Sequence, residues 1–281
     1  MDTLELYRWA VQDPDTHAAV LGAMYESVRP RLRPVVLRED FAGTSAESVA
    51  WVALKPRHRA VAVDLDGATL DWARRRAARL LGPRAADVQF VQGDCLAVGP
   101  PAVPAADIIS VLNFSILYLR EADVLAAYLR SALANLAPGG VLVFNVFGGP
   151  LATTVGTTRH AVEPNPRSAA ETAIPPFHYG WEVRSFDAAS GLIDCRIHFE
   201  IDDAAAPGGV NHLRDAFTYD WRLRSVAELT DACRRAGFSS VQVWRHTYDA
   251  SKGAKGVFLG RIEPRTLEAL DTWTAYIVAC R

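Results

Sequence analysis

Short apolar runs and helical patterns alternate along the chain from Val35 onward. Runs of this length suit strands, and the stretches between them, where apolar residues recur every three or four positions, are long enough for crossover helices. The rhythm predicts a βαβαβ order, and right-handed crossovers then give a parallel sheet with helices on both faces. The apolar runs lie in 35–45, 58–67, 87–94, 106–115 and 141–147, and the helical patterns in 46–54, 68–82 and 121–136.

Two further helical patterns precede the first strand. Residues 3–12 and 14–29 have helical spacing, and the second pattern is opened by Asp13 as N-cap with Pro14 at the first helical position. We expect these helices to form a cap over the edge or mouth of the sheet.

The periodicity changes to two in the second half of the chain. Residues 192–201 alternate strictly between apolar and polar, and 177–186 and 212–223 follow the same pattern, which is typical of strands with one buried face. With a turn at 187–191, they predict an antiparallel sheet, reached through a mobile polar loop at 148–176. The positions of shared parity are Phe177, Tyr179, Trp181, Val183, Ile193, Cys195, Ile197, Phe199, Ile201, Leu213, Phe217, Tyr219, Trp221 and Leu223.

The chain returns to the core pattern near its end. Ser225 and Glu228 have the spacing of a capping box, and 240–249 and 274–281 have the pattern of late strands that form an antiparallel edge. The predicted fold is α/β: a doubly wound, mostly parallel seven-stranded sheet with an N-terminal helical cap and an inserted antiparallel β lid. The expected regions are the cap at 1–34, the ligand-binding α/β core at 35–150, the lid at 151–223 and the completion of the core at 224–281.

Composition narrows the class of protein further. With 30 Lys and Arg against 32 Asp and Glu, the formal net charge of -2 over 281 residues argues against nucleic acid as a partner. There is no run of 18 apolar residues, so no membrane partner is expected, and an acidic N-terminus without an apolar core favours the cytoplasm. The four cysteines lie far apart, without a CxxC pair or a nearby His, so no metal site is expected.

Chemistry is expected beyond the carboxyl ends of the parallel strands, where ligands bind in open α/β sheets. The turn after the first strand contains Gly43, which lets the backbone approach a ligand, although a plain tight turn is the alternative. Asp64 ends the second strand about twenty residues later, from where a carboxylate can accept both hydroxyls of a ribose. Asp66 has the simpler role of a helix N-cap.

Three further segments end the next strands. Asp94 with Cys95 can read the edge of an adenine through a carboxylate and backbone amides, although Asp94 also suits a simple turn. Residues 113–115 bring an amide, a ring and a hydroxyl to the end of the fourth strand, and 136–140 turn a helix into the fifth. Each segment alone is a modest indication of a ligand-binding site, whereas all five in this order and at this spacing would rarely occur together by chance.

Six segments in this order resemble the class I S-adenosylmethionine-dependent methyltransferases: LREDFAGTS, VAVDLD, VQGDC, ADIISVLNFS, LAPGGVLVF and AGFSSVQVW. The resemblance covers residues 35–147 and 224–281. The segment LREDFAGTSAESVAW, with LYRWAVQ upstream and FTYDWRLRSVAEL downstream, is similar to a bacterial subgroup that acts on small molecules. It implies a methyltransferase with S-adenosylmethionine as cofactor and a small-molecule substrate. Asn113, which can accept a hydrogen bond from an amine, favours an amine or amino-acid-like acceptor.

The resemblance also implies which residues bind the cofactor. The backbone of the turn after the first strand would hold the methionine part, and Asp64 the ribose. Asp94 with Cys95 would hold the adenine. Arg38 or Glu39 would anchor the amino-acid end. With Tyr7, whose helix could close over the mouth of the sheet, and Asn113 at the end of the fourth strand, the predicted cofactor-binding residues are Tyr7, Arg38, Glu39, Ala42, Gly43, Asp64, Leu65, Asp94, Cys95 and Asn113.

The turn departs from the usual GxGxG pattern of this family. Phe41 and Ser45 stand at the first and last glycine positions, and only Gly43 remains. The departure affects the expected geometry of the turn. The absence of a GxGxxG segment also argues against a nicotinamide-dependent dehydrogenase.

Methyl transfer from a sulfonium is an in-line displacement, so we expect the protein mainly to align donor and acceptor. The expected catalytic residues are Asn113, where donor meets acceptor, and Tyr179 and Trp181, whose rings can face the cationic sulfonium. Their parity equally suits the core of the inserted sheet, and Tyr7 suits either core packing or closure over the cofactor. No base is assigned, because the imidazoles considered equally suit surface strand positions; they are His178, His198, His212 and His246.

Two other functions stay open on the sequence alone. The same cradle would serve an intramolecular displacement, in which the cofactor's own amine attacks and methylthioadenosine leaves. A non-catalytic protein that binds the cofactor, or an assembly subunit that uses the inserted sheet as its interface, is the third reading. The free edges of an inserted sheet favour pairing across a homodimer.

Overall fold

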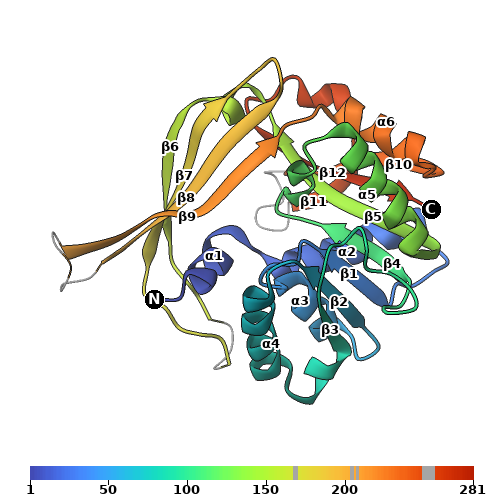
Figure 1. The fold of residues 1–281 in the computed structure, drawn as a ribbon, viewed down its shortest axis with the longest axis horizontal. Helices are drawn as coiled ribbons and strands as arrows, with labels where there is room; N and C mark the ends of the chain where they lie inside the picture. Colours follow the sequence, from blue (N-terminus) through green and yellow to red (C-terminus); the bar gives the residue numbers. More distant parts are fainter. Residues whose placement is uncertain (167–169, 203–205, 207–208, 249–256) are drawn as a thin grey trace.

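The predicted alternation of strands and helices forms one large sheet. In the computed structural model, residues 1–281 are described except 167–169, 203–205, 207–208 and 249–256. The strands are β1 (Val36–Asp40), β2 (Arg59–Asp64), β3 (Val88–Gln92), β4 (Ala106–Val111), β5 (Leu136–Gly148), β10 (Ser240–Tyr248), β11 (Val257–Arg261) and β12 (Trp273–Cys280). Their order is β11-β10-β12-β5-β4-β1-β2-β3, with β12 antiparallel to both neighbours (Figure 1). The doubly wound, mostly parallel sheet is confirmed.

Two details of this sheet differ from the prediction. It has eight strands rather than seven, because β11 pairs with β10 at the edge; its short segment carries no alternation that would reveal a strand. β5 begins at Leu136, which pairs with Ala106 before the register shifts and Val141 pairs with Ile108. The Pro-Gly-Gly segment is therefore an irregularity inside the strand rather than a turn before it. Asp249, expected at the end of a late strand, lies outside the described residues.

Helices cover both faces of the sheet. α2 (Pro14–Val28) and α3 (Ala46–Leu54) pack on one face, whereas α5 (Ala122–Asn135) and α6 (Val226–Ala236) pack on the other. α4 (Gly67–Leu81) contacts β3. Because the crossovers reverse between β1 and β4, the crevice for a ligand lies at the carboxyl ends of these two strands. No helix in the described part of the chain is long and apolar enough to cross a membrane.

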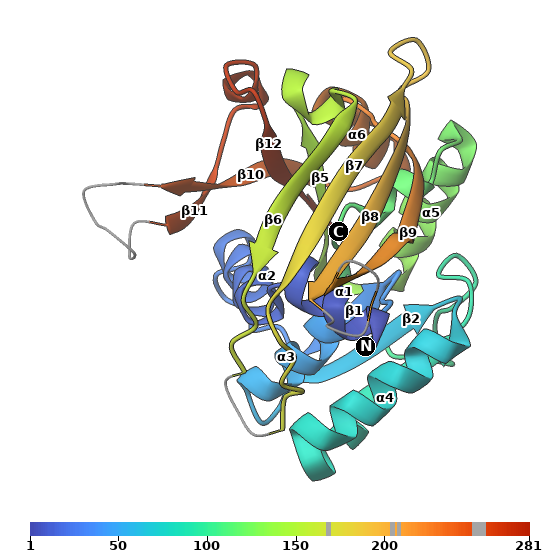
Figure 2. The ribbon, with the colours of Figure 1, turned by 90° about the vertical axis from the view of Figure 1, so that its left-hand side faces the viewer.

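The predicted helix caps are present. The Asp13 carboxylate accepts a hydrogen bond from the Thr16 amide at the start of α2, and Ser225 and Glu228 form the complete capping box of α6. The first helix, α1 (Thr3–Val11), lies between the main sheet and a second sheet (Figures 1 and 2). Leu6 of α1 is fully buried within the large core cluster. The N-terminal helices therefore have a packed, fixed position.

The alternating segments form a second, antiparallel sheet (Figure 2). Its strands, in spatial order, are β6 (Gly156–Val162), β7 (Phe177–Phe186), β8 (Leu192–Asp202) and β9 (Val210–Arg222). The expectation of an uninterrupted loop at 148–176 was wrong, because β6 pairs with β7 along its length. β6 is an edge strand with exposed residues almost throughout, so burial imposed no alternation on it. The division of the chain at 34, 150 and 223 stays a prediction.

The predicted parity of the second sheet decides which face is buried. Ile193, Cys195, Ile197, Phe199 and Ile201 of β8 are all buried, and they join the same core cluster as α1 and the main sheet. The polar positions between them face outward. The second sheet thus packs its apolar face toward the main sheet and α1, which sets the walls of the site.

Candidate active site

The turn after β1 has a glycine-like backbone without the expected glycines. Phe41, Gly43 and Ser45 have φ angles of 56°, 46° and 52°, all in the left-handed region. This conformation costs a residue with a side chain roughly 1–2 kcal/mol. Backbone hydrogen bonds hold it, from the Ala42 amide to the Val63 carbonyl at 3.0 Å and from the Ser45 amide to the Ala42 carbonyl at 2.6 Å. The chain is therefore left-handed at the three positions where the family pattern has glycine.

Asp64 lies opposite this turn at the end of β2. Its Oδ2 accepts a hydrogen bond from the Gly43 amide at 2.7 Å, and its Oδ1 accepts one from the Asp66 amide at 2.9 Å. Each carboxylate oxygen keeps a further lone pair. A Cβ built on Gly43 would meet no atom within 4 Å, so this face of the turn is open. The neighbouring Leu65 is 70% exposed, which leaves an apolar side chain beside a carboxylate.

Asp94 and Cys95 follow β3. The Asp94 carboxylate accepts a hydrogen bond from the Leu96 amide at 2.9 Å, and its carbonyl accepts one from the Ala97 amide, so Asp94 shapes the turn. The Cys95 side chain is buried, and this burial raises the pKa of its thiol. The Asp94 carboxylate is exposed and accessible to a ligand, and the contact of this turn with adenine stays a prediction.

The structure does not support Arg38 as an anchor for the amino-acid end. Arg38 is 1% exposed, and its guanidinium donates to Asp40 Oδ1 at 2.7 Å, to the Val98 carbonyl at 2.7 Å and to the Cys95 carbonyl at 2.8 Å. Burial raises the pKa of Asp40, against the opposing effect of the Arg38 charge. The Tyr128 hydroxyl donates to the other Asp40 oxygen at 2.9 Å. Arg38 therefore joins β1 to the turn after β3 and is closed to ligands.

Glu39 is likewise directed into the protein. Its Oε2 accepts a hydrogen bond from the Ser48 amide at 2.8 Å, and it lies beside Glu47 and His17, whose Oε1 and Nδ1 are 3.0 Å apart. Burial and the Glu47 charge raise the pKa of Glu39. Although burial opposes the charge on both partners, their mutual attraction raises the pKa of His17 and lowers that of Glu47. These side chains join α2 to α3. The structure therefore gives no support to Glu39 as an anchor for the amino-acid end of the cofactor.

The end of β4 has a second strained turn. Asn113 and Phe114 are consecutive residues with φ angles of 52° and 64°, and the Phe114 amide donates to Oδ1 of the buried Asn145 at 2.9 Å. Consecutive left-handed residues with side chains are rare, and such strain gathers at functional sites. Both residues line a cavity.

This cavity, of about 950 Å³, opens between the carboxyl ends of β4 and β5 and the inner face of the second sheet. Its size lies at the upper end of the range for small-molecule sites. It brings together four predicted residues from distant parts of the chain, namely Tyr7, Asn113, Tyr179 and Trp181. The turn at 41–45 and Asp64 do not line it. The predicted residues thus form two adjacent groups: one at the ends of β1, β2 and β3, and one in the cavity.

The sequence left open whether the aromatic residues of the second sheet pack in the core or face the ligand, and the structure divides them between these two roles. Trp221 is 2% exposed and its ring centroid lies 4.3 Å from that of Tyr219, which is also buried, so this pair belongs to the core. Tyr179 and Trp181 are only half-buried, and their rings are available on the cavity side. Tyr7 packs its ring 4.7 Å from Phe217, which joins α1 to the second sheet.

Four tyrosines lie in or beside the cavity, and burial raises the pKa of each, which favours the protonated hydroxyl over the tyrosinate. Burial raises the pKa of Tyr118 to about 12 and also raises those of Tyr7, Tyr179 and Tyr219. All four hydroxyls therefore stay protonated.

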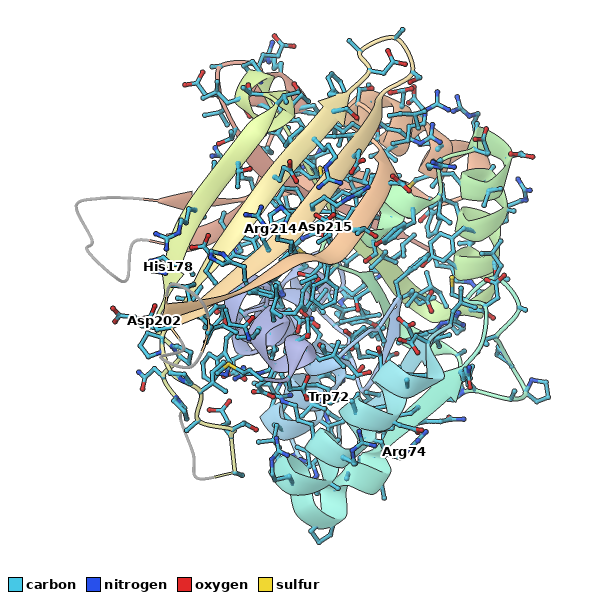
Figure 3. The ribbon with its side chains drawn as sticks, turned by 60° about the vertical axis from the view of Figure 1, so that its left-hand side comes forward. Trp72, Arg74, His178, Asp202, Arg214 and Asp215 are labelled. Carbon is cyan, nitrogen blue, oxygen red and sulfur yellow. The ribbon has the colours of Figure 1, made fainter. Side chains whose placement is uncertain are left out.

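The four histidines considered from the sequence do not line the cavity. His178, His198 and His212 line a hollow on the outer face of the second sheet, the face turned forward in Figure 3 with Arg214 and Asp215. His246 packs 5.5 Å from Tyr276, and burial lowers its pKa.

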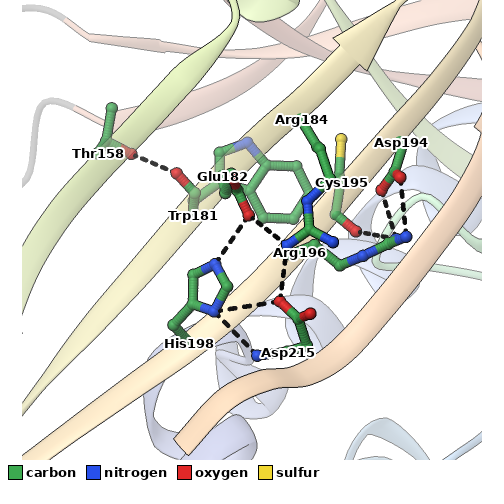
Figure 4. Close-up of polar contacts among 9 residues, drawn as sticks. All are labelled: Thr158, Trp181, Glu182, Arg184, Asp194, Cys195, Arg196, His198 and Asp215. Carbon is green, nitrogen blue, oxygen red and sulfur yellow. Dashed lines mark hydrogen bonds and ion pairs between the residues drawn. The ribbon is translucent and has the colours of Figure 1, made fainter. Parts of the chain in front are cut away.

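On this outer face, Glu182, His198 and Asp215 have ligand atoms within 4.8 Å of one another (Figure 4). Arg184 donates to Glu182 at 3.0 Å and to Asp215 at 2.9 Å. His198 Nδ1 accepts from the Asp215 amide at 2.9 Å. Because Arg184 is shared by both carboxylates and His198 contacts Glu182 and Asp215, these side chains form a hydrogen-bonded ion-pair network.

Several cavity residues were not predicted from the sequence. Phe147, Trp273, His160 and Arg245 come from β5, β12, β6 and β10 and belong to no motif. Phe147 lies at the end of a recognised strand, which was the available signal. The others required knowledge of which strands become neighbours.

Comparisons with known proteins match the fold. No protein-family model matches the chain, and no curated protein does. The amino pentose methyltransferase CalS10 from Micromonospora echinaspora, solved with bound S-adenosylmethionine, matches with a TM-score of 0.64 at 17% identity, covering 98% of this chain and 94% of the other. DesVI from Streptomyces venezuelae matches with a TM-score of 0.65 at 19% identity, covering 98% of this chain and 94% of the other. The sugar N-methyltransferase KedS8 from Streptoalloteichus matches with a TM-score of 0.64 at 19% identity, covering 98% of this chain and 91% of the other. The chain has the fold of the class I S-adenosylmethionine-dependent methyltransferases.

Proposed function

We propose that this protein is an S-adenosylmethionine-dependent methyltransferase that acts on a small molecule. The observation that carries the proposal is the open, left-handed turn after β1 facing Asp64, together with the aromatic cavity that begins at Asn113 on the adjacent strand. Proteins of the same fold include methyltransferases that act on sugars.

The residues around the turn suit this cofactor. Asp64 has lone pairs for ribose hydroxyls, the exposed Leu65 side chain can cover a face of the adenine, and the open backbone at Gly43 admits a close approach. Neither Arg38 nor Glu39 is assigned to the amino-acid end, because both are engaged inside the protein. When bound, the cofactor supplies an electrophilic methyl group on a sulfonium.

The cavity residues hold the acceptor and exclude water. In-line displacement depends on alignment, and Asn113 Oδ1 can accept a hydrogen bond from an amine and so direct its lone pair. The faces of Tyr179 and Trp181 favour a neighbouring cation. Because the buried tyrosines stay protonated, the site suits an acceptor that arrives with a free lone pair, such as a neutral amine.

The cavity volume favours transfer to a second molecule over the intramolecular displacement. A cofactor whose own amine attacked would leave about 950 Å³ of aromatic space without an occupant. No observation favours the non-catalytic alternative. The cytoplasmic location, the homodimer and the absence of a nucleic-acid partner stay predictions.

Calorimetry and product analysis test the proposal. The protein should bind S-adenosylmethionine and S-adenosylhomocysteine at one site per chain, and with pools of small amines it should release S-adenosylhomocysteine and a methylated acceptor, detected by mass spectrometry. Methylthioadenosine released without any acceptor would establish the self-reaction instead. Failure to bind either nucleoside would overturn the proposal.

A further inference from the structure

We propose that the acceptor is a large aromatic molecule with an anionic group, and that Arg245 binds this group. The inference rests on the proposed function and specifies its substrate class. It departs from the sugars on which the proteins of similar fold act. Three features of the cavity carry it: the nature of its walls, the environment of Arg245 and the distance from Arg245 to the end of β4.

Aromatic rings make up much of the cavity wall. Among the described residues its lining has no Asp, Glu or Gln side chain, and besides Asn113, His160 and Arg245 its polar side chains are five threonines and three tyrosines. Flat apolar rings gain from stacking and from burial of their area. The aromatic lining residues are Tyr7, Phe114, Phe147, His160, Tyr179, Trp181, Tyr219, Trp221 and Trp273.

Arg245 differs from the arginines on the outer face of the second sheet, which are either paired or exposed to water. Arg159 pairs with Glu200, Arg184 with two carboxylates and Arg196 with a third, whereas Arg214 is exposed. Arg245 is half-buried and lines the apolar cavity, and within the described residues its side chain has no hydrogen bond or ion pair. A guanidinium partly removed from water gains most from an anionic partner with which it can form two parallel hydrogen bonds.

The sheet order sets the size of the acceptor. Asn113 follows β4 and Arg245 lies on β10, and the order β4-β5-β12-β10 places three strand spacings between them. At about 4.8 Å per spacing this amounts to roughly 14 Å. A single sugar or a free amino acid cannot reach from one to the other. The acceptor must therefore place its nucleophile and its anion at opposite ends of a multi-ring body.

Two fluorescent probes of similar shape test this inference. The anionic probe is 8-anilinonaphthalene-1-sulfonate, and the neutral probe is N-phenyl-1-naphthylamine, each titrated into the full chain in the presence of S-adenosylhomocysteine. Arg245→Gln should weaken binding of the anionic probe about tenfold, as expected for the loss of a charged hydrogen bond, and leave the neutral probe unchanged. Arg245→Lys should restore part of the affinity.

Two controls locate the probes. Trp181→Ala should weaken both, because it removes a wall of the cavity, and Arg31→Gln, which alters an exposed arginine, should weaken neither. Equal effects of Arg245→Gln on both probes, no effect on the anionic probe, or no binding of that probe would each overturn the inference.

The cofactor titration keeps the two proposals apart. A protein that binds S-adenosylmethionine but shows no preference for the anionic probe retains the methyltransferase proposal and loses this one. A protein that binds no S-adenosylmethionine, yet binds the anionic probe through Arg245, retains an anionic aromatic site and loses the methyltransferase proposal.

Discussion

The two halves of the site are built in opposite ways. At the turn after β1, a few residues close in sequence are held by short polar contacts and a strained backbone, as at Gly43 and Asp64. In the cavity, residues from both sheets and α1 meet through rings, and few hydrogen bonds tie them. The first half depends on backbone conformation, and the second depends on shape. Substitutions should therefore act on cofactor affinity in one half and on packing or turnover in the other.

The largest loss of stability is expected at Trp221, a cavity-lining residue that is also buried in the core. Trp221→Ala should lower the free energy of unfolding by about 3–5 kcal/mol, because the ring is fully enclosed. Trp181→Ala, at a half-buried ring, should reduce turnover more than stability. Urea unfolding and steady-state kinetics measure the two. If Trp181→Ala lost as much stability as Trp221→Ala while keeping normal turnover, both rings would be core.

The next effect concerns the buried ion pair beneath the turn. Arg38→Met should destabilise the protein by about 3 kcal/mol, since it leaves the Asp40 carboxylate buried without its partner. Arg74→Met, at an exposed pair with Asp71, is the matched control and should cost no more than about 0.5 kcal/mol. Equal midpoints of urea unfolding in the two variants would show that Arg38 is not structural.

A smaller effect is expected on cofactor affinity, and it should distinguish Asp64 from the neighbouring Asp66. Asp64→Ala should weaken S-adenosylmethionine binding by about 1–3 kcal/mol, the value of hydrogen bonds to a charged group. Asp66→Ala removes only the N-cap of α4 and should cost about 1 kcal/mol of stability with unchanged affinity. Calorimetric titration of both variants decides the matter, and the assignment of Asp64 would be wrong if the two affinities changed alike.

The smallest effect is a pH dependence. Because the pKa of His17 is raised in the folded protein, the stability that its charge contributes is fully present below pH 6.5 and is lost as the pH rises through the raised pKa. His17→Gln should therefore differ most from the unsubstituted protein at about pH 6 and less at about pH 9. Urea unfolding at both values measures this. A difference that grows with pH would contradict it.

Some of the site was accessible from local signals. The proximity of Asp64 to Gly43 was predictable, because a strand end and a glycine turn about twenty residues apart form a recognisable pattern. Arg38 and Glu39 lie next to the same turn, but proximity in the sequence says nothing about which way a side chain points, and both side chains are directed into the protein. The Val98 carbonyl that accepts from Arg38 comes from much later in the chain, and Glu39 accepts from the Ser48 amide of α3.

Sequence alone determined the order of the helices and of the strands other than β6 and β11, the caps at Asp13 and Ser225 and the buried parity of β8, because periodicity and capping depend on neighbouring residues. Only the tertiary structure decided that β6 joins the second sheet, that Phe41 and Ser45 adopt a left-handed backbone, and that Arg245 shares a cavity with Asn113. These outcomes depend on contacts between segments far apart in the chain, and a local pattern does not encode such contacts.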